Sequence, residues 1–268
     1  MNKEKVWYQF HTVLEYVTVL SNLSKGIHLN INQNINKITL PFPKSFEQKQ
    51  RLIDLTYQNL VFENKQVLDD ANFAFLCCSW IAPKGYYLLF TQQCLLFYLL
   101  TMEDKHINFD HGKLRKCFDE KLLNKSIEFE IDIFNQVRLY KSAIEYTTKS
   151  GSIFSKNTSE KLGLILKKNV IYAEEDFKRR KNIVDYRTKS NREKKERFLL
   201  DNKTSLYHFF YHMRIKSNYR DLEFMKYSEI SNQLDDFINF YKNYYSLIMN
   251  FYGAYDSAIS DLIKMRLG

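Results

Sequence analysis

Residues that interrupt helices are scarce in this sequence. Its 268 residues include only 7 Gly and 3 Pro. Both residue types break regular helical structure, so their scarcity argues for long helices rather than a turn-rich fold. Segments rich in Leu, Lys, Glu and Asn point the same way. We therefore predict a mostly helical, all-α protein.

Cysteine is also infrequent, and its spacing gives no metal or disulfide signal. The four cysteines are Cys77, Cys78, Cys94 and Cys117, and none of them forms a CxxC pair. Two adjacent cysteines do not easily bridge to each other. These residues are therefore expected to be small core residues in a reducing compartment, which argues against a disulfide framework or a zinc site.

The sequence lacks the short motifs that mark common enzyme classes. It has no HExxH, no Walker loop, no GxSxG and no glycine-rich dinucleotide turn. Metalloprotease, NTPase and hydrolase functions therefore have little support. Lone acids such as Asp110 and Asp221 do not make a metal cluster. We expect no cofactor and no bound metal.

Long hydrophobic runs are missing as well. The longest apolar stretch, from Tyr86 to Leu100, is interrupted by Thr91, Gln92 and Gln93. This stretch is too short and too polar at its middle to span a bilayer. The N-terminus has no apolar segment of the kind found in signal peptides. We therefore expect a cytoplasmic protein without a membrane partner.

Hydrophobic residues, aromatic residues and positive charge are well represented. Hydrophobic residues make up 45% of the chain and aromatic residues 16%, which allows a sizeable core with many ring contacts. The formal net charge of +9 is compatible with a polyanionic partner such as RNA. Solubility alone explains such a charge equally well.

Apolar periodicity and turn residues divide the chain into helices, one irregular arm and one loop. Predicted helices cover 5–22, 46–63, 86–100, 111–123, 127–148, 160–197, 204–226 and 229–266, and residues 68–82 form a further apolar segment. Ser45 is the predicted N-cap of the second helix, with Gln48 completing a capping box. A break is predicted near Pro83-Lys84-Gly85, between this apolar segment and the helix over 86–100. Residues 27–44 form an irregular arm with a short strand, and 149–159 form a loop.

The stretch 206–225 has the most informative pattern. Its core face carries Leu206, Phe209, Phe210, Met213 and Phe224 at helical spacing. Arg214 shares a second side with Tyr207, Tyr211, Asn218 and Asp221. A third stripe holds His208, His212 and Tyr219. Such a helix can both pack and do chemistry, although a surface arginine on an ordinary amphipathic helix fits the same pattern.

A basic segment precedes that helix. Between Lys178 and Arg197 the chain has ten Lys or Arg residues against three acids. Such a run is either a solvated face or a set of contacts to nucleic-acid phosphates. The candidate RNA-binding residues are Lys178, Arg179, Arg180, Lys181, Arg187 and Lys216.

Three pieces, in order, resemble the HEPN superfamily of helical-bundle proteins. The first is Gly85-Tyr86-Tyr87-Leu88-Leu89-Phe90, followed by Leu95-Leu96, which looks like an aromatic pair early in a long core helix. The second is His111-Gly112-Lys113-Leu114 through Phe118. The third is Met213-Arg214-Ile215-Lys216-Ser217-Asn218-Tyr219, similar to the arginine-bearing helix of that family. The resemblance covers roughly residues 70–260.

The resemblance implies an all-α, HEPN-like up-and-down helix bundle. We expect an N-terminal helical or irregular arm at 1–66 and a bundle at 67–268, with an inserted helical segment at about 125–200. Many HEPN proteins are dimeric, metal-independent ribonucleases of toxin–antitoxin, abortive-infection or CRISPR-linked defence systems. The implied partners are RNA and either a second copy or an antitoxin or defence protein. The family motif is an arginine, four to six intervening residues and then a histidine, whereas positions 219–221 of this sequence are Tyr, Arg and Asp.

RNA cleavage without metal needs a base, a donor for the phosphorane charge and an acid. Arg214 suits the second role, and histidine suits the first. We predict a site made of Arg214, Asn218 and Tyr219, with His208 or His212 as base. His208 and His212 also fit a surface or interface role. His111 is a further candidate for the base, and it also fits a helix cap or loop.

Three hypotheses follow. The first is an RNA-cleaving effector, a metal-independent endoribonuclease of a bacterial defence or toxin–antitoxin system. The second is a non-catalytic HEPN-like subunit that binds RNA or protein, because the motif histidine is missing. The third is a purely structural helical protein whose basic charge confers solubility.

Overall fold

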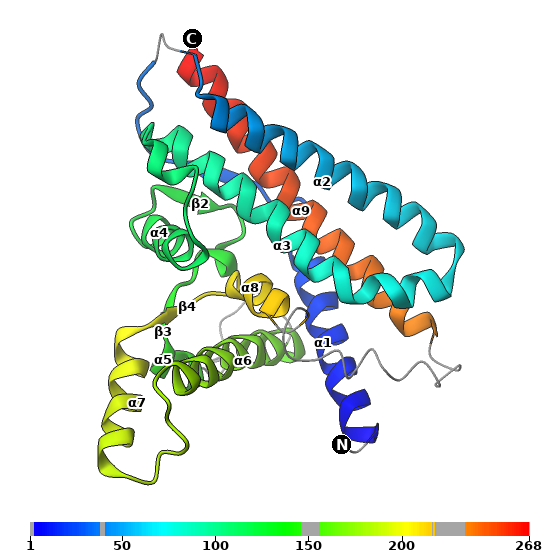
Figure 1. The fold of residues 1–268 in the computed structure, drawn as a ribbon, viewed down its shortest axis with the longest axis vertical. Helices are drawn as coiled ribbons and strands as arrows, with labels where there is room; N and C mark the ends of the chain where they lie inside the picture. The colour runs from blue at the N-terminus through cyan, green and yellow to red at the C-terminus, as the bar shows by residue number, and fades with distance from the viewer. Residues whose placement is uncertain (1–2, 38–40, 146–155, 216, 218–233, 268) are drawn as a thin grey trace. The chain divides into compact units, whose positions relative to one another are not determined.

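The computed structural model of the chain describes residues 3–37, 41–145, 156–215, 217 and 234–267 (Figure 1). Two compact units form, the first from residues 1–131 and 213–268 and the second from residues 132–212. The described elements are overwhelmingly helices, with a few short strands. The all-α prediction is therefore confirmed.

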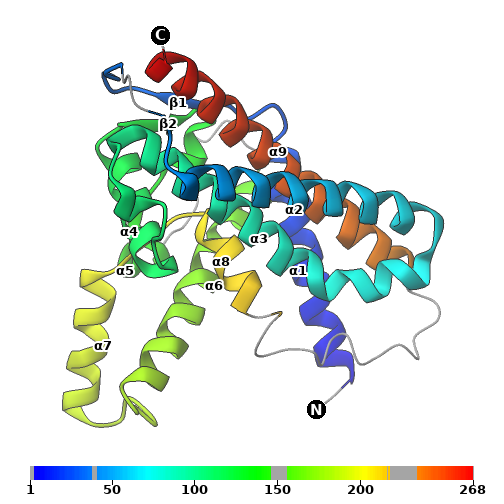
Figure 2. The ribbon, with the colours of Figure 1, turned by 45° about the horizontal axis from the view of Figure 1, so that its top comes forward.

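The first unit is built around three long helices that lie side by side (Figures 1 and 2). Helix α2 (Lys44–Asp69) and helix α3 (Ala71–Thr101) form a tight hairpin. Asp70 separates them, and its carboxylate accepts hydrogen bonds from the backbone N–H groups of Asn72 and Phe73 at 2.8 and 3.2 Å. This side chain caps α3 and fixes where the chain reverses.

Helix α9 (Leu234–Leu267) runs parallel to α3 and completes the core. The register follows from three hydrogen bonds along the pair: Cys78 to the Phe237 carbonyl, Gln92 to the Tyr252 carbonyl, and Gln93 to the Tyr255 hydroxyl. At the far end, the buried guanidinium of Arg266 donates to the carbonyls of Leu99 and Leu100. A cation bound to these carbonyls stabilises the C-terminal end of α3.

Helix α1 (Lys3–Leu23) packs against α9. The ring of Phe10 lies 5.0 Å from that of Phe237 and 5.6 Å from that of Phe240. Asn250 of α9 donates to the Ser21 carbonyl at 3.2 Å. The sequence assigned residues 1–66 to a separate arm, whereas in the structure α1 and α2 belong to the first unit together with α3 and α9.

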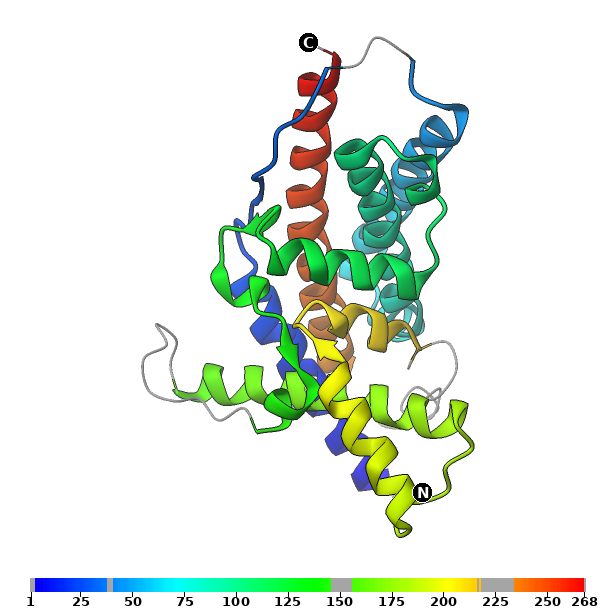
Figure 3. The ribbon, with the colours of Figure 1, turned by 90° about the vertical axis from the view of Figure 1, so that its left-hand side faces the viewer.

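Smaller elements complete the first unit. A 3-10 turn, η1 (Asp104–His106), leads to helix α4 (His111–Leu123). Strand β1 (Leu29–Ile31) pairs antiparallel with β2 (Ile127–Phe129), with Leu29 opposite Phe129. The blue segment that contains β1 runs along α9 in Figure 3. The predicted short strand in the 27–44 arm is thereby confirmed.

The second unit surrounds a smaller core. Its elements are η2 (Asp132–Asn135), β3 (Arg138–Leu139), α5 (Tyr140–Ile144), α6 (Lys156–Arg180), α7 (Lys189–Asp201) and β4 (Lys203–Thr204). Strands β3 and β4 pair antiparallel, with Arg138 opposite Thr204. Phe177 of α6 stacks on Phe198 of α7, with 4.4 Å between the ring centres. Helix α8 (His208–Ile215) starts here, and its last residues belong to the first unit.

The predicted break near Pro83 is wrong, because α3 continues through that proline. A proline inside a helix costs about 3 kcal/mol through its missing N–H and its clash with the preceding turn. Ile81, Tyr86, Leu88 and Leu89 on either side of Pro83 are buried. Burying each large apolar side chain gains about 1.5–3 kcal/mol, so packing outweighs the cost.

The predicted helix over 127–148 is also wrong. Within the described part, 127–145, the first residues form β2, Asp132–Asn135 is a single 3-10 turn, and the α-helical part is Tyr140–Ile144. Ile127 and Phe129 alternate with exposed or half-exposed neighbours, and they pair with a strand almost a hundred residues earlier. Local periodicity does not register such a distant partner.

The predicted helix over 160–197 divides into two. Asn182 adopts a left-handed conformation with φ of 52° just after α6 ends. Asparagine tolerates this conformation better than most residues and often ends helices. Thr188 then caps α7, accepting a hydrogen bond from the Asn191 N–H at 3.3 Å.

Two predicted helix starts need correction. Helix α2 begins at Lys44, with Pro43 at its N-cap position, so Ser45 is not the cap. The Pro43 carbonyl accepts the first helical bond, from the Phe46 N–H at 2.9 Å. Helix α8 begins at His208 rather than 204, because Thr204 pairs in the β3–β4 sheet. The predicted continuation of this helix to 226 lies almost wholly outside the described residues. Of the predicted loop over 149–159, residues 149–155 also lie outside them, and residues 156–159 are not loop, because they form the first turn of α6.

One described helix, Asn72–Thr101, is long and apolar enough to cross a membrane by length and composition. The sequence predicts a shorter apolar segment, which begins at Tyr86 after a break near Pro83. Of the most apolar part of the helix, 61% is buried inside the protein. Such burial is typical of the core helix of a soluble protein, and a cytoplasmic location stays a prediction.

Candidate functional site

Arg214 lies against two helices of the first unit, α3 and α4. Its side chain extends from α8 and is only 7% exposed. One guanidinium nitrogen, Nη1, donates to the Tyr87 hydroxyl of α3 at 3.0 Å. The same nitrogen lies 3.3 Å from Nε2 of His111, the first residue of α4. The arginine is therefore held by side chains from two other helices.

Two consecutive tyrosines of α3 flank the guanidinium. Its central carbon lies 5.0 Å from the ring centre of Tyr86 and 5.6 Å from that of Tyr87. Successive residues of a helix point about 100° apart, and these two rings are inclined by 72° to each other. Both distances are within the range of cation–π attraction, which adds to the hydrogen bond from Tyr87.

The start of α4 determines where His111 sits. Asp110 is the N-cap of this helix, and its carboxylate accepts a hydrogen bond from the Lys113 N–H at 2.9 Å. The imidazole of His111 packs 4.4 Å from the Phe90 ring, measured between ring centres. Its Nδ1 lies 2.9 Å from the Tyr86 hydroxyl. The cap and these two aromatic neighbours fix the orientation of the ring.

The neighbours of His111 also define its tautomer. Arginine can only donate hydrogen bonds, so Nε2 of His111 must offer its lone pair to Arg214. In the neutral ring, Nδ1 then carries the proton and donates to the Tyr86 oxygen. Burial and the Arg214 charge lower the pKa of His111 from its ordinary 6.5 to about 4, against a smaller opposing effect of Asp110. The imidazole is therefore neutral at pH 7, with an acceptor directed at the guanidinium.

This cluster combines three chemical abilities at one point. The guanidinium is permanently charged and suits phosphate oxygens. A neutral imidazole nitrogen can accept a proton, and a phenol can donate one. Within the part of the chain that the structure describes, no group of three or more His, Cys, Asp or Glu side chains could hold a metal ion. The cluster fits chemistry carried out by side chains on an anionic substrate.

The predicted site residues have different positions. Arg214 is in the cluster. His208 and His212 are 1% and 6% exposed and belong to the second unit, where the His212 ring contacts Tyr172 at 5.7 Å. They occupy a different stripe of α8 from Arg214, as 100° per residue requires. Their role as a base stays a prediction. Asn218, Tyr219 and Lys216 lie outside the described residues.

Two residues of the cluster had no predicted role. Tyr86 and Tyr87 attracted attention only as an aromatic pair at the start of an apolar helix. Their hydroxyl groups were the available signal, because two phenols in a helix expected to be buried all round need hydrogen-bond partners. The sequence is compatible with His111 as a base or as a helix cap. The N-cap of α4 is its neighbour Asp110, so the cap role is wrong.

The predicted RNA-binding residues that the structure describes lie on α6 and the following turn. Arg179 and Arg180 are exposed and form ion pairs with Asp176. Arg187, whose side chain is 91% exposed, pairs with Asp185 at 3.6 Å. Lys181 is exposed, and Lys178 lies over the Tyr186 ring at 5.2 Å. These contacts are exposed, so phosphate groups could replace the acids at little cost.

No protein-family model matches this sequence, and neither the curated proteins nor the solved structures contain a significant match.

Proposed function

We propose that the chain is a HEPN-type, metal-independent endoribonuclease, a defence or toxin effector. The observation that supports this most is the joint position of Arg214, His111 and Tyr87. Nη1 of Arg214 lies 3.0 Å from the Tyr87 hydroxyl oxygen and 3.3 Å from Nε2 of His111. A permanent cation, a neutral base and a phenol are the groups that cleavage next to a 2′-hydroxyl requires.

In this proposal the scissile phosphate takes the place of His111 as the acceptor for Arg214. The guanidinium donates to non-bridging oxygens and stabilises the charge of the phosphorane. The released Nε2 of His111 accepts the proton of the 2′-hydroxyl. Tyr87, whose oxygen accepts from Arg214, retains its own proton for the leaving 5′-oxygen. Tyr86 positions His111 through Nδ1 and keeps the tautomer.

Substrate binding improves the base. Free His111 has a pKa of about 4 and is a weak base. A phosphate beside the ring adds a negative charge and neutralises the arginine, and both effects raise the pKa of the histidine. A base whose pKa approaches the working pH is the most effective. The site therefore becomes active when the anion arrives.

RNA contacts remote from the scissile bond come from the basic residues of α6 and its turn. These contacts are independent of sequence and weaken with salt, by a slope of about −0.7 per phosphate for single strands. The family resemblance also implies a homodimer, or a complex with an antitoxin or defence partner. Light scattering of the purified chain measures the first of these.

The test is incubation of total RNA with the purified chain in EDTA. Arg214→Gln and His111→Gln should each slow cleavage by about a hundredfold or more, the usual effect of losing a charge-stabilising group or a general base. Lys116→Gln, which removes a cation from the exposed face of α4, is the matched control and should leave the rate unchanged. Intact RNA with the wild type, or equal rates in all variants, would remove the proposal.

The low pKa of His111 also favours a second function, a non-catalytic subunit that holds RNA or a partner protein through Arg214. A histidine with a pKa of about 4 is engaged as an acceptor rather than held ready for protons. This alternative predicts salt-sensitive RNA binding that Arg214→Gln weakens, with no cleavage by the wild type. Loss of cellular toxicity in Arg214→Gln, with folding intact, would contradict it.

A further inference from the structure

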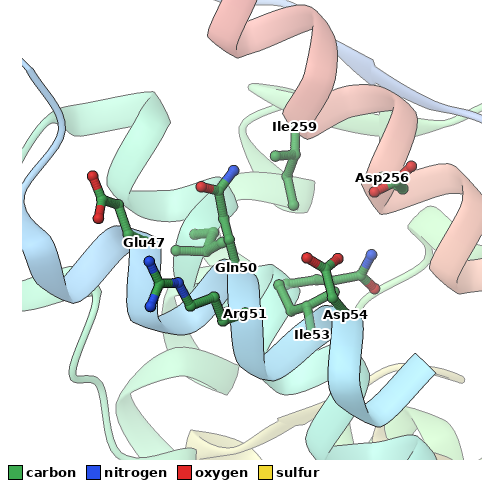
Figure 4. A pocket seen from close by; sticks show the side chains of 9 residues that line it. Glu47, Gln50, Arg51, Ile53, Asp54, Asp256 and Ile259 are labelled. Carbon is green, nitrogen blue, oxygen red and sulfur yellow. The ribbon is translucent and has the colours of Figure 1, made fainter. Parts of the chain in front are cut away.

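A hollow of about 350 Å³ lies between α2 and α9, over α3. Figure 4 shows side chains that line it, among them Glu47, Arg51 and Asp54 of α2 and Asp256 and Ile259 of α9. The volume is within the range of small-molecule sites. Three carboxylates and one guanidinium line it, so the hollow is acidic although the chain as a whole carries +9.

Gln92 gives the hollow an acceptor that is already desolvated. This α3 side chain lines the hollow and is 0% exposed. Its Nε2 donates to the Tyr252 carbonyl at 3.2 Å, which assigns the other end of the amide to oxygen. That oxygen is buried and has no hydrogen-bond partner among the described residues. A buried acceptor without a partner is costly, so a hydrogen-bond donor that reached this oxygen from the hollow would be favoured.

The surrounding acids also favour a positive charge. Burial and the charge of Asp54 both raise the pKa of Asp256 above its ordinary value. Burial, Asp256, Tyr57 and Asp54 together raise the pKa of Tyr252 to about 12. Tyr57 stacks on Tyr252 at 4.6 Å, one helical turn from the two acids. Both raised pKa values are those expected where negative charges lie close together, and a bound cation would reduce the repulsion between them.

The shape of the lining distinguishes an organic cation from a metal ion. Besides its polar groups, the hollow is lined by three apolar side chains, those of Ile53, Leu95 and Ile259. A divalent metal prefers six or more oxygen ligands at close range, and the described residues include no such cluster. An alkyl chain would cover the apolar side chains, and ammonium groups at its ends would reach the acids.

We propose that this hollow is a binding site for an aliphatic diamine or polyamine. One ammonium group lies between Asp54 and Asp256 and donates to the Gln92 oxygen, while the methylene chain packs on Ile53, Leu95 and Ile259. The site is independent of the nuclease proposal, because α3 provides different residues to each: Gln92 and Leu95 here, and Tyr86 and Tyr87 beside Arg214.

The test is calorimetric titration of the full chain with spermidine at low salt. We expect saturable binding with one site per chain. Asp256→Asn should weaken it by about tenfold or more, because a charge-assisted hydrogen bond is lost. Asp261→Asn is the matched control, with the same change of charge on the same helix, at a residue paired with Lys264 outside the hollow. Gln92→Leu removes the buried acceptor and should also weaken binding, with circular dichroism confirming its fold.

Two results would overturn the proposal. Equal spermidine affinity in Asp256→Asn and Asp261→Asn would mean that the amine binds elsewhere on the surface. Saturation of the same heat signal by Mg²⁺ at a similar concentration would mean that the hollow takes any cation. Both measurements are independent of RNA cleavage, so they separate this proposal from the nuclease.

Discussion

Removing the charge of Arg214 should raise the pKa of His111. The two nitrogen atoms lie 3.3 Å apart, and the guanidinium opposes protonation of the imidazole. At roughly 4 Å, a unit charge contributes about 1 kcal/mol in water and about 4 kcal/mol at the effective dielectric of a protein surface. At 1.36 kcal/mol per pKa unit, this range corresponds to about 0.7 to about 3 units.

The overall lowering of the His111 pKa limits how much of it the Arg214 charge can cause. The pKa of His111 falls from 6.5 to about 4, and burial is a larger cause than Arg214. The arginine therefore accounts for less than half of the lowering effects, roughly one unit by this Coulomb estimate. Arg214→Gln should bring the pKa of His111 up to about 5, by the same reasoning.

Proton NMR titration of the imidazole Cε1–H signal measures this directly, with His111→Gln to assign the resonance. Arg214→Lys retains a charge and should leave the pKa low. Lys116→Gln removes an exposed cation from the same helix and should change it little. An unchanged or lower pKa in Arg214→Gln would refute the proposed coupling between the two side chains.

Three further predictions concern stability, each measured by urea unfolding. Gly85→Ala should destabilise the chain by about 1 kcal/mol, because its Cβ would overlap the Ile248 side chain of α9 and this overpacking outweighs the gain in helix propensity. Gly253→Ala, with open space around it, should stabilise the chain by about 0.5–1 kcal/mol. Stability changes of the same sign in the two variants would contradict this reasoning. Lys84→Met should cost about 2 kcal/mol by leaving the buried Glu63 carboxylate without its ion pair, and adding Glu63→Gln should recover part of that loss; no recovery would argue against it. Folding lowers the pKa of His111, so on acidification the unfolded chain is protonated first, and the free energy of unfolding falls as the pH drops from about 6.5 to about 4. His111→Gln should make the free energy of unfolding less dependent on pH in this range. The same pH dependence in the wild type and in His111→Gln would refute this prediction.

The fold class was predictable because helical periodicity is local. Apolar spacing located α1, α4 and most of α9 within a few residues, since each helix buries one face or all faces. Two of the failures involve a distant partner or a single backbone angle. The strand at Ile127–Phe129 depends on β1, and the end of α6 coincides with the left-handed Asn182.

The sequence predicted Arg214 as part of the candidate site and offered His111 as one of several possible bases. Arg214 stood out on a polar side of a helix whose other side is apolar. Tyr86 and Tyr87 belong to a helix predicted to be buried on all sides, because an analysis of apolar spacing counts an aromatic ring as apolar even when it carries a hydroxyl group. Their hydrogen bonds exist because the first residue of α4 and the last turn of α8 lie beside α3, which is a long-range result of packing.

The most direct test of the nuclease proposal compares two substrates. In EDTA, the wild type should cleave a single-stranded RNA and leave the same sequence with 2′-O-methyl groups bound but intact, because the base acts on the 2′-hydroxyl. Arg214→Gln should cleave neither. Equal cleavage of both substrates, or cleavage by Arg214→Gln at the wild-type rate, would contradict the account.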